Sequence, residues 1–85
     1  MFGLTAALHG NITRVRGQAQ QSNFHDYRSL RHDERPRATV LILDRGEPPT
    51  GVGEPGVPPV IPALGNALFA LTGRRQRSLP LRADA

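Results

Sequence analysis

Residues 47–59 read Glu47-Pro48-Pro49-Thr50-Gly51-Val52-Gly53-Glu54-Pro55-Gly56-Val57-Pro58-Pro59 and hold five of the eight prolines and three of the nine glycines of the chain. Glycine at Gly51 and Gly53 lets another group approach the backbone closely. Pro55-Gly56 is the usual pair for the two central positions of a type II turn. The stretch is therefore predicted to be a stiff loop that presents the carboxylate of Glu54 at a fixed point.

A simple connector is the alternative interpretation of this loop. Segments rich in proline and glycine are most often linkers, and an acid within one usually faces water. Local composition alone favours the connector. A resemblance to a known family, given below with the residues that carry it, favours a functional loop instead.

A helix is predicted directly after the loop, over residues 59–72. Apolar residues recur there at helical spacing, namely Val60, Leu64, Ala67, Leu68 and Leu71. Pro62 is expected within the first turn, where proline is tolerated, and Gly73 is expected to cap the end. Gly65 costs helix stability and is expected to mark a close contact. The start of the helix is expected to offer unpaired backbone N–H groups that favour an anionic ligand near Glu54.

Three shorter elements are predicted before the loop. Residues 2–8 form a helix that ends at Gly10, and a hairpin turns at Arg16-Gly17 between residues 12–15 and 18–23. The run Thr39-Val40-Leu41-Ile42-Leu43 is continuously apolar, which fits a strand covered on both faces. The predicted fold class is α+β, with a short helix, a β-hairpin, a buried strand, the Pro/Gly loop and a C-terminal helix.

Composition limits the classes of protein that fit. At 85 residues and 38% hydrophobic content the chain is expected to have a thin core. It has no cysteine, so neither a disulfide nor a thiolate metal site can stabilise it. No apolar stretch is long enough to predict a membrane span, and no targeting signal opens the chain. Localisation is left open between the cytoplasm and the periplasm.

Two His-Asp pairs raise the possibility of a metal site. His25-Asp26 is followed by His32-Asp33 seven residues later. Zinc, however, needs three or four converging ligands, and no second cluster completes the set. A structural turn near residues 21–27, followed by a solvated run, is therefore the preferred interpretation.

A basic tail raises the possibility of nucleic-acid binding. The net charge is +4, all eleven basic residues are arginines, and four of them lie near the end of the chain: Arg74, Arg75, Arg77 and Arg82. Against this, the arginines are interleaved with acids, only four aromatic residues occur, and no known nucleic-acid-binding motif is visible. A small arginine-rich binding protein remains the alternative hypothesis, and no nucleic-acid partner is expected.

Residues 51–59, followed by Pro62-Ala63-Leu64 and Thr72-Gly73-Arg74-Arg75, resemble the carboxyl end of the large subunits of molybdenum hydroxylases, the xanthine dehydrogenase and aldehyde oxidase family. Gly3 to Leu8 resembles a Gly-Leu-Ser-x-Ala-Leu run of that family. The pattern is nearest to the isoquinoline 1-oxidoreductase β-subunit branch and extends from about residue 3 to residue 81. It implies that residues 1–81 are the C-terminal part of a larger molybdopterin-binding domain and that residues 82–85 are a disordered tail.

The resemblance also implies a chemistry. In the family, the glutamate that matches Glu54 is the base that takes a proton from a molybdenum-bound hydroxide, which attacks an N-heteroaromatic ring or an aldehyde. Gly51, Val52 and Gly53 are then expected to contact the cofactor, a molybdopterin in its cytosine dinucleotide form. The expected partners are the remainder of the large subunit and a small subunit carrying iron–sulfur clusters. The 85-residue chain alone is expected to be inactive.

Two positions depart from the family pattern. Arg16 stands where the family prefers an acidic residue before the turn glycine. Gln76 stands where an apolar residue is usual, so weaker docking of the tail is expected.

Overall fold

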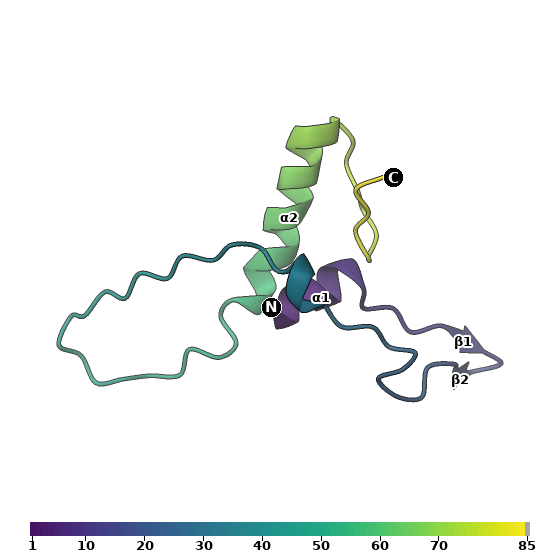
Figure 1. Ribbon diagram of the computed structural model, residues 1–85, viewed down its shortest axis with the longest axis horizontal. Coiled ribbons are helices and arrows are strands. Elements are labelled where there is room, and N and C mark those ends of the chain that lie inside the picture. The colour runs from purple at the N-terminus through teal and green to yellow at the C-terminus, as the bar shows by residue number, and fades with distance from the viewer. Residues whose placement is uncertain (85) are drawn as a thin grey trace.

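The computed structural model describes residues 1–84 and contains two α-helices, one short hairpin and one turn of 3₁₀-helix. In chain order the elements are α1 (Phe2–Leu8), β1 (Arg14–Val15), β2 (Gln18–Ala19), η1 (His32–Glu34) and α2 (Val57–Thr72). Figure 1 shows α1 lying across the lower end of α2, with the hairpin and the long loop before α2 projecting to opposite sides. The predicted α+β class is confirmed, and α1 has the predicted bounds.

Helix α2 begins at Val57, earlier than predicted. Pro58 and Pro59 therefore occupy the second and third positions, where a helix does not need their missing N–H groups. The expectation that Pro62 lies in the first turn is wrong, since the earlier start moves it into the helix interior. The predicted cap is confirmed: Gly73 is left-handed at φ 69°, and its N–H donates to the carbonyl of Phe69 at 2.7 Å.

The core forms where α1 crosses the first turns of α2. Gly3 lies so close to α2 that a Cβ atom added to it would be 2.6 Å from Cγ1 of Val60. The buried apolar residues of the described chain are Ala7, Leu68 and Leu81, which are 0%, 8% and 5% exposed. Leu81 joins the end of the chain to α1, because its N–H donates to the carbonyl of Ala7 at 2.7 Å. The close contact expected at Gly65 is wrong, since nothing lies within 4 Å of its Cβ position.

The predicted hairpin is confirmed, with shorter strands. Arg16 and Gly17 both have positive φ, 52° and 80°, which is the pattern of a type I′ turn. The strands pair with Val15 opposite Gln18. Beyond the strands the pairing continues through a side chain, because the Oε1 atom of Gln21 accepts from the Thr13 N–H at 2.8 Å.

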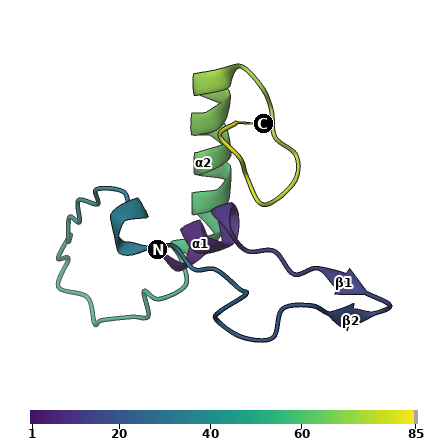
Figure 2. The same cartoon turned by 45° about the vertical axis from the view of Figure 1, so that its right-hand side comes forward.

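The buried strand predicted over residues 39–43 is wrong for this chain. Val40, Leu41, Ile42 and Leu43 are 80–88% exposed and belong to no strand. A β-strand needs a neighbour to satisfy its backbone N–H and C=O groups, and no other segment of residues 1–84 pairs with this one. Figure 2 shows the segment within a wide loop that stands away from both helices.

The chain is therefore extended for its size, and the expectation of a thin core is confirmed. Its accessible surface is 7692 Å², whereas a compact protein of this mass would expose about 4,900 Å². Its radius of gyration is 16.3 Å, against about 12 Å for a compact domain of this length. None of the helices formed by residues 1–84 has the length and apolar character needed to cross a membrane.

Candidate functional site

The loop that carries Glu54 is fixed to the start of α2 by a turn. The carbonyl oxygen of Glu54 accepts a hydrogen bond from the Val57 N–H at 2.9 Å, with Pro55 and Gly56 between them. Gly56 has φ −78° and ψ −15°, which fits a type I turn. The predicted type II turn is therefore wrong. Because Gly56 is also the N-cap of α2, its backbone turns directly into the helix.

The residues predicted to form the site lie next to one another in the open. Gly51, Val52, Gly53 and Glu54 are all exposed. Nothing lies within 4 Å of the Cβ positions of Gly51 or Gly53, so another group has room to approach their backbone. Within residues 1–84 the Glu54 side chain forms no hydrogen bond or ion pair. The loop thus presents a free carboxylate beside accessible backbone.

The start of α2 does not offer the anion site that was expected. The four positions from Gly56 to Pro59 are those whose amides have no partner inside the helix. Pro58 and Pro59 have no N–H, and the N–H of Val57 already donates to Glu54. Only the Gly56 amide is left free among these described residues. The predicted cradle of several N–H groups is therefore wrong, because prolines occupy the second and third positions of the helix.

The turn at residues 22–27 uses one of the two His-Asp pairs structurally. The Asp26 carboxylate accepts hydrogen bonds from the backbone N–H groups of Asn23 and Ser22, each at 3.0 Å, and lies 3.5 Å from the His25 ring. These amides, that of Asn23 above all, hold the pKa of Asp26 below its ordinary value of 3.8. In the part of the chain that is described, no three His, Cys, Asp or Glu side chains are grouped to hold a metal ion.

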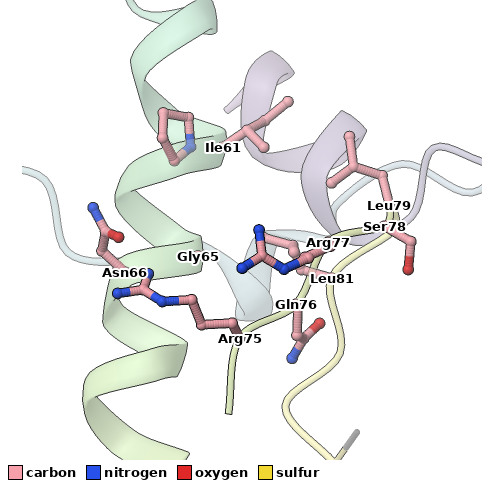
Figure 3. A pocket seen from close by; sticks show the side chains of 10 residues that line it. Ile61, Gly65, Asn66, Arg75, Gln76, Arg77, Ser78, Leu79 and Leu81 are labelled. Carbon is pink, nitrogen blue, oxygen red and sulfur yellow. The ribbon is translucent and has the colours of Figure 1, made fainter. Parts of the chain in front are cut away.

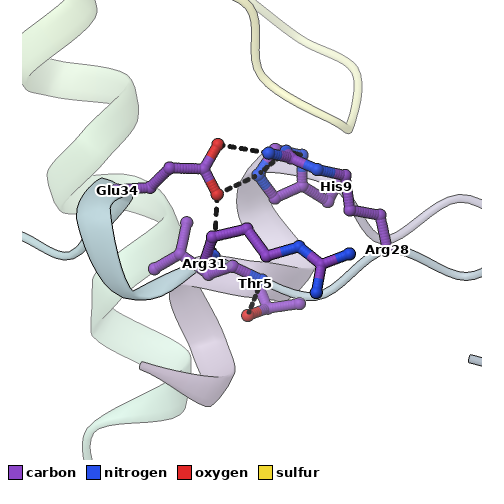
Figure 4. A network of polar contacts seen from close by, with 6 residues as sticks. Thr5, His9, Arg28, Arg31 and Glu34 are labelled. Atoms are coloured by element: carbon purple, nitrogen blue, oxygen red, sulfur yellow. Dashed lines mark hydrogen bonds and ion pairs between the residues drawn. The ribbon is translucent and has the colours of Figure 1, made fainter.

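A polar network that the sequence did not reveal fastens residues 28–34 to α1 (Figure 4). The carboxylate of Glu34 accepts from the Arg31 N–H at 2.7 Å and from the Arg28 guanidinium, and it lies 3.8 Å from His9. The Arg31 amide, followed by Arg28, lowers the pKa of Glu34 from its ordinary value. The Leu30 N–H adds a bond to the hydroxyl of Thr5 at 3.2 Å. The partners are 25 residues apart in the last bond, so no local pattern could predict it.

The tail after α2 folds back along the helix and is closed by Gln76. The Gln76 side chain accepts from the Arg82 N–H at 2.7 Å and donates to the Arg82 carbonyl. Two cavities of 330 and 420 Å³ open along this tail, and both are lined by Arg75 and Arg77. Figure 3 shows the smaller one, between α2 and the tail. The Gln76 amide thus joins the two arms of the tail as a clasp and does not prevent its docking. The expectation of weaker docking stays a prediction. Arg82, the first residue of the predicted disordered tail, is therefore held by hydrogen bonds to Gln76. Ala85, the last residue of that tail, lies outside the described residues.

Sequence comparisons identify three relatives that match nearly the whole chain. It is 39% identical over 80 residues to the isoquinoline 1-oxidoreductase β-subunit of Brevundimonas diminuta, covering 94% of this chain. It is 38% identical over 82 residues to a membrane-bound aldehyde dehydrogenase of Gluconacetobacter polyoxogenes, whose name specifies pyrroloquinoline quinone, and 33% identical over 95 residues to a nicotinate dehydrogenase subunit of Pseudomonas putida. The chain spans only 8–11% of the length of these relatives. No protein-family model and no solved structure matches it.

Proposed function

We propose that this chain, which is related over nearly its whole length to the large subunits of molybdenum hydroxylases, forms part of an oxidoreductase that acts on heteroaromatic rings or aldehydes. The observation that carries the proposal is 39% identity over 94% of the chain to the isoquinoline 1-oxidoreductase β-subunit. The resemblance drawn from residues 3–81 is confirmed by three relatives. All three are named as dehydrogenases or oxidoreductases, so nucleic-acid binding is not favoured.

Glu54 is proposed as the general base of this reaction. Its backbone is fixed by the hydrogen bond to Val57, whereas its carboxylate is free. A general base must reach the proton that it takes, so a fixed backbone with an unengaged side chain suits the role. A molybdenum cofactor bound in such a site would supply Lewis acidity, which makes a proton of the reacting group easier to remove. Glu54 would receive that proton at a carboxylate oxygen and hold it.

Gly51, Val52 and Gly53 are proposed to contact the cofactor through their backbone. The free space at both glycine Cβ positions supports close approach of a flat group such as a pterin. The prolines at the start of α2 do not suit phosphate binding there, so we place the phosphate contacts of the cofactor outside this chain. The cytosine dinucleotide form of molybdopterin is part of the same proposal.

The chain is proposed to work only with further polypeptide. We take residues 1–81 as the C-terminal part of a molybdopterin-binding domain and propose two partners, the rest of the large subunit and a small subunit with iron–sulfur clusters. The extended shape and thin core support this dependence, because residues 1–84 bury only three apolar side chains and leave Glu54 uncovered. The isolated chain should bind no molybdenum and show no turnover.

The test is Glu54→Gln in a complete subunit. Residues 1–85 would replace the matching stretch of the isoquinoline 1-oxidoreductase β-subunit, and turnover with an N-heterocycle or an aldehyde would be measured together with molybdenum content. The amide keeps the size of the carboxylate but cannot accept the proton, so the rate should fall by about a hundred- to ten-thousandfold with unchanged molybdenum.

Glu47→Gln is the matched control, since it makes the same change in an exposed acid ahead of Gly51 and should leave turnover unchanged. Normal turnover of the Glu54→Gln subunit with full metal content would refute the role of base. Because one relative is named for pyrroloquinoline quinone, quinone content is measured too. Quinone without molybdenum in an active subunit would refute the proposed cofactor.

A further inference from the structure

The exposed apolar run at residues 40–43 is the largest feature of the chain that the proposed function does not use. Val40, Leu41, Ile42 and Leu43 are 80%, 84%, 88% and 81% exposed. The backbone there is not helical and forms no hydrogen bond with another part of residues 1–84. Four neighbouring large apolar side chains in water are a strong sign of an interaction surface.

The run is apolar on both of the faces that a strand would have. Side chains alternate between the faces of an extended chain, so Val40 and Ile42 share one face and Leu41 and Leu43 share the other. A strand at the edge of a sheet usually carries a charge or a proline that prevents further pairing. Residues 39–43 contain neither. This pattern suits a central strand with a neighbour on each side and a covering layer above and below.

The lengths of the relatives indicate what the neighbours are. The matched stretch covers 94–96% of this chain but only 8–11% of each relative. In a relative, the corresponding run therefore belongs to the same polypeptide as a remainder roughly ten times longer. We propose that residues 39–43 add as a central strand to a β-sheet supplied by the rest of the oxidoreductase subunit. The inference rests on the proposed function for the identity of that subunit.

The strand also bears on the site, because the loop of Glu54 follows it within the same wide segment (Figure 1). Only eight residues separate Leu43 from Val52. Addition of the strand to a sheet would fix one end of the loop, while the turn at Glu54 and α2 fixes the other. Docking of the strand is thus a way to place Glu54 against groups that this chain lacks.

The test measures binding and needs no molybdenum, so it can fail independently of the catalytic role. The probe is the isoquinoline 1-oxidoreductase β-subunit of Brevundimonas diminuta, shortened by the stretch that matches this chain. Affinity of residues 1–85 for the shortened subunit is measured by titration, and hydrogen exchange of the amides of residues 40–43 is followed in the free chain and in the complex. We expect fast exchange in the free chain and strong protection in the complex.

Variants on each face make the test specific. Leu41→Asp and Ile42→Asp should each weaken binding by about tenfold to a hundredfold, since each removes the burial of a large apolar side chain. Leu71→Asp is the matched control on α2, where Leu71 is 78% exposed, and should leave binding unchanged.

Four results of the binding measurements would overturn the proposal: no binding of the shortened subunit, binding without protection of residues 40–43, equal weakening by Leu71→Asp, or a loss of affinity for the variant on only one face. Sedimentation of the free chain tests whether a second copy of this chain binds the run at residues 40–43 instead. Self-association that depends on Leu41 and excludes the shortened subunit would assign the strand to a second copy, and so would also overturn the proposal.

Discussion

Replacing Gly3 with alanine should loosen the contact between α1 and α2. The added Cβ would lie 2.6 Å from Cγ1 of Val60, 3.2 Å from Cα of Val57 and 3.3 Å from its carbonyl oxygen. Val60 cannot turn away easily, because a β-branched residue has one preferred rotamer in a helix, and the Val57 atoms belong to the backbone. The two helices must therefore move apart.

The size of the effect follows from two opposing terms. Overpacking of this kind costs about 1–3 kcal/mol, and the close backbone contacts place Gly3 at the upper end. Alanine returns about 1 kcal/mol through its better helix propensity. The net loss of docking free energy is then about 2 kcal/mol, which corresponds to a factor of roughly thirty in the ratio of docked to open chains.

Hydrogen exchange of the Leu81 amide measures this docking directly, because that N–H donates to Ala7 of α1. Its protection should fall by about tenfold or more in the Gly3→Ala chain. Gly65→Ala is the matched control: nothing lies within 4 Å of that Cβ position, so helix content measured by circular dichroism should rise and Leu81 protection should not fall. Unchanged protection in the Gly3→Ala chain would refute the crossing of the helices at Gly3.

Three further predictions concern the hairpin, the Asp26 turn and the tail. Arg16→Asn should stabilise the hairpin by about 1 kcal/mol, measured from its population in NMR spectra, since asparagine tolerates the positive φ of 52° better than arginine; an unchanged population would contradict the type I′ turn. The folded pKa of Asp26 is lowered, so the unfolded chain takes up its proton first as the pH falls. The turn is therefore fully stabilised above about pH 4 and weakens below it, and the Ser22 amide shift should titrate with a midpoint under 3.8; a midpoint above 3.8 would contradict this. Gln76→Ala should abolish protection of the Arg82 amide without changing helix content, and retained protection would show that the clasp is not needed.

Local signals allowed α1, the hairpin turn and the C-terminal end of α2 to be predicted from the sequence. Gly73 caps α2, Gly10 follows the end of α1, and Arg16-Gly17 forms the hairpin turn, because each depends on the backbone preferences of one or two residues. Placement of Glu54 in a loop immediately before the helix could be predicted for the same reason. Its role as a base was implied by resemblance and stays a prediction.

Only the tertiary structure decided where α2 starts and which residues meet across the chain. The crossing at Gly3, the bond between Thr5 and Leu30, and the clasp between Gln76 and Arg82 join residues that no helical or strand period relates. The sequence pattern of residues 39–43 is that of a strand that requires cover, yet the pattern cannot say whether cover is present. Burial depends on neighbours, and residues 1–84 provide three buried apolar side chains and none in this run. Local preference fixes a backbone shape, whereas the free energy of burial is a property of the packed molecule as a whole.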